Sequence, residues 1–231
     1  MRKFDYSFLN NTLLPASLIN LTSGIASLKT MAGVRKQEYA KIFTELEAIA
    51  KVQSVKSSNA IEGIVTSDER IAAIVNQDSA PLNHTEGEIA GYRDALNAIH
   101  LNHDNLDLRE SDILRLHEAM MQIAGYEYGG KYKTGDNYII EEDKDGNRKV
   151  RFKPTPASEV ETAMEQLELA YMDARNDAGI NQLLLIPCVI LDFFASIPSA
   201  TATEECRGCL LFCFFIKTVM MPESMFPLKS R

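Results

Sequence analysis

The sequence predicts a mostly α-helical protein with one β-hairpin. Apolar residues recur every three to four positions over most of the chain, which is the period of an amphipathic helix. By contrast, residues 138–152 hold two short β-prone runs around a polar segment that contains the turn signal Asp145-Gly146. The 231 residues are 45% hydrophobic, which is enough for one sizeable core or two small ones.

The net charge and the lengths of the apolar runs disfavour several classes of protein. The formal net charge of −8 disfavours a non-specific nucleic-acid binder, which needs a basic face. Residues 1–6 are charged with no apolar run after them, so we expect no signal peptide. The longest apolar run, residues 183–194, falls short of the roughly 20 residues of a membrane span. We therefore expect a soluble cytoplasmic protein without a membrane segment, and the sequence leaves homo-oligomerisation open.

The N-terminal part predicts helices over residues 12–34, in one piece or two, and from about residue 41 onward. Pro15 suits the first turn of the earlier helix. The later helix should pack through one apolar face and end at Gly63, a residue type that commonly stops helices. The apolar face consists of Ile42, Phe43, Leu46, Ile49 and Ala50, and the polar face carries Lys41, Glu45 and Lys51.

Further helices are expected over residues 69–76, 87–103 and 111–123, then from about 158 and over 183–194. Ser158 and Glu161 have the spacing of a capping box at the start of one of them. The inward positions expected for residues 111–123 are Ile113, Leu116, Met120 and Ile123. Those expected for the helix after the hairpin are Val160, Ala163, Met164, Leu167 and Tyr171.

Two features could form binding sites. Ser58 and Glu62 are spaced i, i+4 and share a helix face, and a carboxylate there could hold an arginine bidentately. The plainer interpretation is a solvated helix end with a glycine stop. Tyr138, Ile139 and Ile140 begin the hairpin, whose edge could pair with an extended peptide. The alternative is a surface flap that binds nothing.

The metal-binding signals are weak. His84, His100, His103 and His117 have no metal-ligand spacing, and His117 reads as a core or boundary residue. Cys206, Cys209 and Cys213 could hold zinc or an iron–sulfur cluster, but no fourth ligand is near them in the sequence. We therefore predict no metal site.

Three segments together resemble the Fic family of proteins (filamentation induced by cAMP, the Fic/Doc or Fido fold). S-S-N-A-I-E-G, which holds Ser58, Glu62 and Gly63, resembles the family's inhibitory-helix motif. The hairpin followed by P-T-P and a helix resembles the family's flap, which binds the target protein. L-L-L-I-P-C-V-I-L-D-F-F resembles the helix that leads into the catalytic loop. The resemblance covers most of residues 35–195 and implies a helical bundle with one hairpin flap.

In the family, that helix is followed by H-P-F-x-x-G-N-G-R-x-x-R, and this motif occurs nowhere in the chain. The protein sequence nevertheless permits codons that encode this motif in the neighbouring reading frame. Codons exist for Ser196–Gly208 that give I-H-P-F-S-D-G-N-G-R-M-S-R when read from the last base of the Ala195 codon. We infer that one base was lost near the codons for Phe193–Ala195, by mutation, in a pseudogene or as a sequencing error.

The resemblance divides the chain into three parts. Residues 1–105 form an N-terminal helical region with the inhibitory motif at 58–63, and residues 106–195 form an incomplete Fic domain. Residues 196–231 form an out-of-frame tail, which also accounts for the cysteine cluster.

The resemblance implies transfer of AMP from Mg-ATP to a hydroxyl of a target protein. In the family, the motif histidine is the general base and the Gly-Asn-Gly turn cradles the phosphates. The inhibitory glutamate competes for an arginine that grips the γ-phosphate. Without these motif residues, we expect no catalytic residue and no productive binding of ATP or Mg²⁺ in this chain. The alternatives are a non-catalytic interaction module or, with less support, a cysteine metal site.

Overall fold

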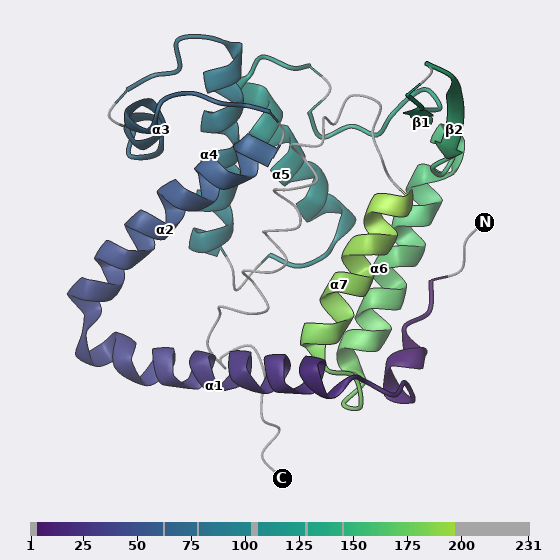
Figure 1. Cartoon of the computed structure of the whole chain (residues 1–231), viewed down its shortest axis with the longest axis horizontal. Coiled ribbons are helices and arrows are strands. Elements are labelled where there is room, and N and C mark those ends of the chain that lie inside the picture. The colour runs from purple at the N-terminus through teal and green to yellow at the C-terminus, as the bar shows by residue number, and fades with distance from the viewer. Residues whose placement is uncertain are drawn as a thin grey trace.

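The computed structural model describes residues 4–61, 63–77, 79–102, 106–127, 129–144 and 146–196. The side chains of Gln37, Ile61, Ile139, Phe194 and Ser196 are outside this description. Figure 1 shows helices on two sides of the molecule, joined along the bottom by a long helix, with a hairpin at one upper corner. The prediction of a mostly helical fold with one hairpin is therefore confirmed.

Two long helices run along the bottom and the left side of the molecule in Figure 1. They are α1 (Ala16–Glu38) and α2 (Ala40–Ile61), which meet at a sharp corner at Tyr39 (Figure 1). Residues 12–34, for which one helix or two were expected, fall in the single helix α1 apart from their first four positions. None of the described side chains of α1 is buried, so this helix adds little to the core.

The first hydrophobic core lies between α2, α3 (Asp68–Val75), α4 (His84–Asn102) and α5 (Glu110–Ile123). The packing of α4 against α5 is close because Gly91 faces the partner backbone. A Cβ atom at Gly91 would lie 2.0 Å from the carbonyl oxygen of Met120, so only glycine fits this crossing. Ser67 caps α3 by accepting a hydrogen bond from the amide of Arg70.

The second core is formed by α6 (Val160–Asn176) and α7 (Gln182–Ser196), together with part of α5 and the N-terminal segment. Phe4 and Tyr6, just before the short helix η1 (Ser7–Asn10), are buried in it. All five positions expected to point inward from α6 are buried. The apolar helix predicted over residues 183–194 also forms, with Leu185, Val189 and Phe193 in this core.

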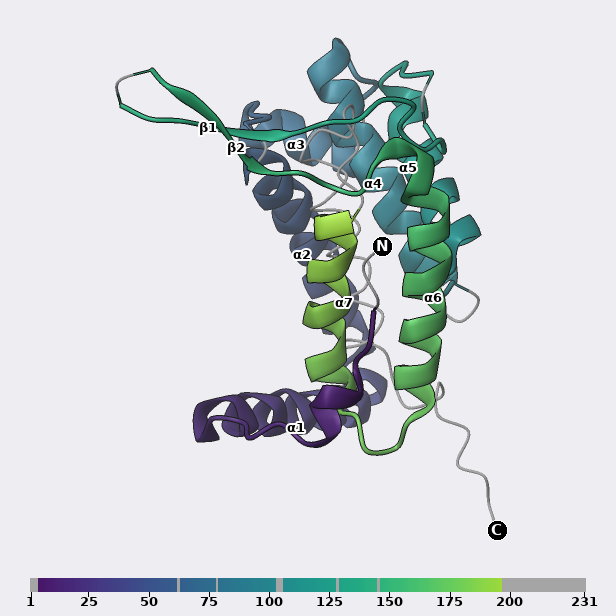
Figure 2. The ribbon, with the colours of Figure 1, turned by 90° about the vertical axis from the view of Figure 1, so that its right-hand side faces the viewer.

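The hairpin consists of β1 (Ile139–Glu142) and β2 (Arg148–Phe152), paired antiparallel. It projects well beyond the helices (Figure 2), and all five residues of β2 are exposed. Over the described ranges, no helix combines the length and the apolar character that crossing a bilayer requires.

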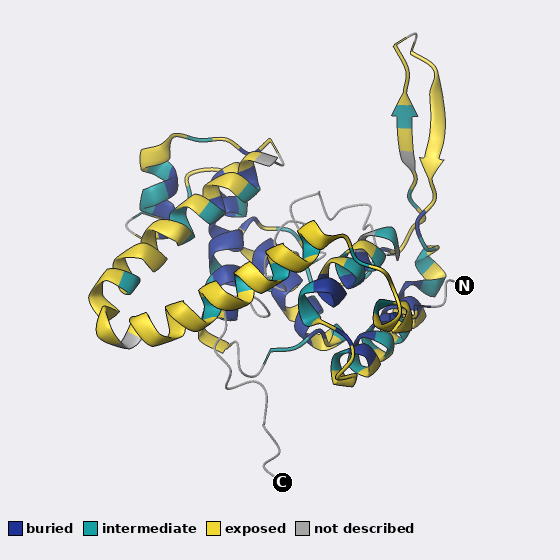
Figure 3. Ribbon diagram, turned by 60° about the horizontal axis from the view of Figure 1, so that its bottom comes forward, coloured by how far each residue is buried: buried dark blue, intermediate teal, exposed yellow. Residues whose placement is uncertain are grey.

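Three expectations from the sequence are wrong. The face of α2 predicted to pack is exposed: Ile42, Leu46 and Ile49 keep 53%, 54% and 55% of their surface (Figure 3). Ile123, expected to point inward, is 39% exposed because it ends α5. The capping box of Ser158 does not form either. Residues Ala157–Glu159 make a short 3-10 turn (η2), and α6 begins at Val160 without a side-chain cap.

Candidate functional site

The C-terminal end of α2 holds the described part of the predicted inhibitory motif. Gly63 has φ +79°, the left-handed conformation that glycine adopts without strain. Its amide donates to the carbonyl of Ala60 at 3.1 Å, and the Ile64 amide donates to that of Asn59 at 2.9 Å. These two bonds form a Schellman motif, in which the residue after the glycine packs back on the helix. Gly63 thus stops the helix as predicted, and Ile64 is buried in the first core.

Side-chain contacts hold this helix end against α3 and α4. The hydroxyl of Tyr92 donates to Oγ of Ser58 at 2.9 Å, and Lys56 pairs with Asp68 at 2.6 Å. Asn59 is buried, and its side-chain amide donates to the carbonyl of Val55 at 2.8 Å. Ser58 therefore lies at a helix interface. Glu62, the other half of the predicted pair, lies outside the described residues.

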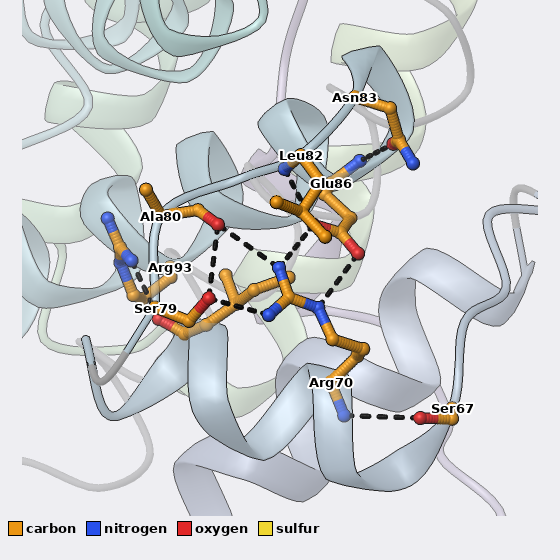
Figure 4. Close-up of polar contacts among 9 residues, drawn as sticks. Ser67, Arg70, Ser79, Ala80, Leu82, Asn83, Glu86 and Arg93 are labelled. Atoms are coloured by element: carbon orange, nitrogen blue, oxygen red, sulfur yellow. Dashed lines mark hydrogen bonds and ion pairs between the residues drawn. The ribbon is translucent and has the colours of Figure 1, made fainter.

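An ion pair fixes the connection between α3 and α4 (Figure 4). Nε of Arg70 donates to one carboxylate oxygen of Glu86 at 2.9 Å, and Nη2 donates to the other. The same guanidinium reaches Oγ of Ser79 at 2.6 Å, and the amide of Leu82 donates to the Glu86 carboxylate at 2.8 Å. The bond from Arg70, followed by that from Leu82, lowers the pKa of Glu86 below its usual range. These bonds join α3 to the start of α4, and we call this arrangement the structural clamp.

The hairpin presents different chemistry on its two faces. Ile140 pairs with Val150 and Glu142 pairs with Arg148, so these four residues share one face. The other face carries Glu141 opposite Lys149, where Glu141 lies 3.3 Å from Lys149 and 3.5 Å from Arg151. Ile140 is 56% exposed and Val150 50%. The projecting hairpin therefore offers one face that combines an apolar pair with an ion pair, and one face that is charged.

The base of the hairpin is tied to the body of the protein. The carboxylate of Asp136 accepts a hydrogen bond from the amide of Ala157 at 2.7 Å, which closes the chain across the two strands. Lys133, which is buried, donates to the side chain of Asn137 at 2.7 Å. Tyr138 lies just before β1, half-exposed, and the Lys153 ammonium lies 5.5 Å from its ring centre.

Helix α7 leads to the position where the catalytic motif is expected. Its described part ends at Ser196, and Ile197 and the residues after it, Cys206, Cys209 and Cys213 included, lie outside the described residues. The C-terminal ends of α2 and α7 and the base of the hairpin all lie toward the upper end of the molecule (Figures 1 and 2). The fold therefore brings the three segments that carry the resemblance to one end.

The histidines that the structure describes form no site of their own. His117 is buried, and its Nδ1 accepts a hydrogen bond from the amide of Gly130 at 3.2 Å, so it is a core residue as predicted. Burial lowers the pKa of His117. Within the described parts of the chain, no three His, Cys, Asp or Glu side chains gather where they could hold a metal ion.

The sequence alone did not predict the role of some residues that stabilise this end of the molecule. Tyr92 lies 34 positions from Ser58, and Arg70 lies 16 positions from Glu86 and 9 from Ser79, so no local spacing marks these contacts. A buried tyrosine on a helix is usually assigned to the core on apolar character alone. Only its hydroxyl, which seeks a partner when buried, could have suggested the contact with Ser58.

The chain has two groups of helices, a projecting hairpin and an apolar helix that packs beside α6, and this arrangement is that of a Fic-type fold. A Fic family protein from Desulfovibrio desulfuricans G20 is similar, with a TM-score of 0.66 and 17% sequence identity. A Fic domain containing signaling protein from Bacteroides thetaiotaomicron VPI-5482 is similar with a TM-score of 0.68 and 15% identity. The chain has the Fic fold.

The coverage of these comparisons is uneven. The first comparison covers 89% of this chain but 59% of the Desulfovibrio protein, and the second covers 84% of this chain and 72% of the Bacteroides protein. This chain thus spans less than two thirds of the first solved structure. No profile of a known protein family matches the sequence, and no curated protein matches it either.

Proposed function

We propose that this chain descends from a Fic-type protein adenylyltransferase and is itself inactive. Such an enzyme transfers AMP from ATP to a hydroxyl of a target protein. One observation carries the proposal: the described part of α7, the helix that should lead into the catalytic loop, ends at Ser196, and the residues after it permit codons that encode H-P-F-x-x-G-N-G-R in the neighbouring frame. The Fic fold of the residues before this point supports the same origin.

The residues present do not fit Mg-ATP. The family's phosphate cradle needs the Gly-Asn-Gly turn and the arginines of the motif, and the sequence holds none of them at that place. Loss of a general base alone reduces a rate by about 10²–10⁴-fold. Losing the phosphate cradle as well leaves no measurable transfer by this chain. The inhibitory residues Ser58, Glu62 and Gly63 then have no arginine of the motif to block.

Binding of a target protein by the hairpin would not depend on the lost motif. Its β2 strand is exposed along its whole length, so its edge is open to an extended segment of a target protein. Tyr138, Ile139 and Ile140 stand at the start of β1, where they would contact such a segment. This favours a second candidate function, that of a non-catalytic module which binds a protein and does not modify it.

An AMP-transfer assay with labelled ATP tests the proposal. The chain as it stands is compared with a version in which one base is inserted near the codons for Phe193–Ala195, with codons chosen to restore the motif. We expect labelling of protein by the restored chain only. Robust labelling by the present chain would contradict the claim of inactivity. If the restored chain folds but transfers no AMP, even with Glu62→Gly added to remove inhibition, the proposed descent fails.

A further inference from the structure

An apolar stripe on α2 has no partner among the described residues. The stripe consists of Ile42, Leu46 and Ile49, each of which keeps more than half of its surface exposed. At 100° per residue these three side chains share one side of the helix. Val55, which is buried in the first core, lies on the opposite side. The stripe therefore points away from the contact that holds α2 to the body.

Leaving this stripe in water is unfavourable. Full burial of one such side chain is worth about 1.5–3 kcal/mol, and side chains in a row gain this together when one segment covers them. The neighbouring helix α1 has the same character, with Leu21 and Leu28 exposed at 64% and 66% and only one charged residue, Lys29, before Arg35. A helix with so few charges is poorly suited to full solvation.

The same chain contains a segment that needs such a surface. Residues 209–221 read C-L-L-F-C-F-F-I-K-T-V-M-M, in which every residue except Lys217 and Thr218 is apolar. The segment follows α7 after residues 197–208, twelve positions. A chain of that length reaches about 40 Å when extended.

We propose that residues 209–221 dock on the stripe formed by Ile42, Leu46 and Ile49. The tether decides between this segment and other occupants. Covalent attachment through only twelve residues holds the segment at an effective concentration on the order of millimolar, above the concentration at which a second copy of the chain competes. A stable interface between proteins uses about 20–30 residues a side, whereas the stripe offers three. The docking is independent of the proposed function, because it needs neither ATP nor the lost motif.

Native cysteines make the docking testable in the full chain. Leu46→Cys places a thiol in the stripe, within reach of Cys209 or Cys213 if the segment lies there. Thr44→Cys is the matched control, since Thr44 is exposed on the other side of the same helix. After mild oxidation we expect an intrachain disulfide from Leu46→Cys to Cys209 or Cys213, independent of protein concentration and lost in the Thr44→Cys variant. Equal crosslinking in both variants, or a covalent dimer through the new cysteines, would overturn the proposal.

Hydrogen exchange gives a second measurement that does not depend on disulfide geometry. The amides of residues 42–49 are followed in the full chain, in a chain that ends at residue 208, and in the full chain with Phe212→Asp and Phe215→Asp. We expect both variants to lose protection at these amides, while the amides of α6 remain protected and report an intact fold. Unchanged exchange in residues 42–49, with or without the segment, shows that the segment docks elsewhere. If α6 also loses protection, the segment supports the second core instead, and the proposal fails equally.

Discussion

The hydroxyl of Tyr92 donates a 2.9 Å hydrogen bond to Oγ of Ser58, which joins α4 to the end of α2. Ser58 belongs to the segment that resembles an inhibitory motif, so this contact fixes the end of the helix that carries the described part of this segment. The Lys56–Asp68 pair and the buried Asn59 act on the same helix end. Together they hold the end of α2 on a rigid frame built by α3 and α4.

Replacing Tyr92 by phenylalanine should weaken this frame. The change removes one hydrogen bond and leaves Ser58 half-buried without its donor, so we expect a loss of about 1 kcal/mol in the free energy of unfolding. Urea denaturation followed by circular dichroism measures it. Tyr39→Phe is the matched control, because Tyr39 is 47% exposed and should lose little. If the two variants are equally stable, the bond to Ser58 contributes nothing.

Gly63→Ala should destabilise the protein through the backbone alone. No atom lies within 4 Å of a Cβ placed at Gly63, so the cost comes from the φ of +79°, on the order of 1–2 kcal/mol. Gly33→Ala is the opposite control. Gly33 lies within α1, also with open space around it, and alanine there should stabilise the helix by about 0.5–1 kcal/mol. Thermal denaturation of both variants checks the sign of each change, and a Gly63→Ala variant as stable as the original chain would contradict the helix stop.

The sequence predicted α6 well and α2 poorly for one physical reason. Leu167 and Tyr171 repeat with the helical period, and α7, the partner of α6, is encoded intact just after it. Leu46 and Ile49 repeat with the same period, but they are exposed. Periodicity predicts that a face is apolar; it does not say whether the element that covers this face is present.

The sequence likewise predicted some features of the candidate functional site and not others. The glycine stop and the hairpin follow from local residue preferences, which Gly63 and the Asp143–Asn147 turn satisfy. The contacts of Tyr92 and Glu86 depend on which helices meet, and this is not encoded in any one segment. The capping box failed because residues Ala157–Glu159 form a 3-10 turn, so α6 begins at Val160 and Ser158 is not the residue that precedes it.

Acid should weaken the fold through His117. Burial lowers the pKa of this imidazole in the folded chain, so the unfolded chain takes up its proton at higher pH. The stability is full above the unfolded pKa of about 6.5 and falls as the pH drops below it, until the folded pKa is passed. In His117→Gln, the fall between about pH 7.5 and 5.5 should be smaller. Equal slopes in the original chain and in His117→Gln would contradict this contribution of His117 to the acid sensitivity.

The clamp between Arg70 and Glu86 predicts a difference between two ion pairs. Glu86→Gln should lower the urea midpoint clearly, because a nearly buried carboxylate there accepts from two sides. Glu47→Gln, which removes the exposed pair with Lys36 at 2.7 Å, should leave the midpoint near that of the original chain. Since the pKa of Glu86 is lowered, its contribution is present above the usual glutamate range and lost as the pH falls below about 4. A midpoint that Glu86→Gln and Glu47→Gln change equally would show that the clamp is no stronger than a surface pair.

The nucleotide sequence of the gene across the codons for Phe193–Gly208 tests the central claim most directly. If the catalytic motif was lost through one missing base, the neighbouring frame of that DNA reads H-P-F-x-x-G-N-G-R directly after α7. Codons that encode Ser196–Gly208 but cannot give the histidine, the asparagine and the arginine of the motif in that frame would contradict the account.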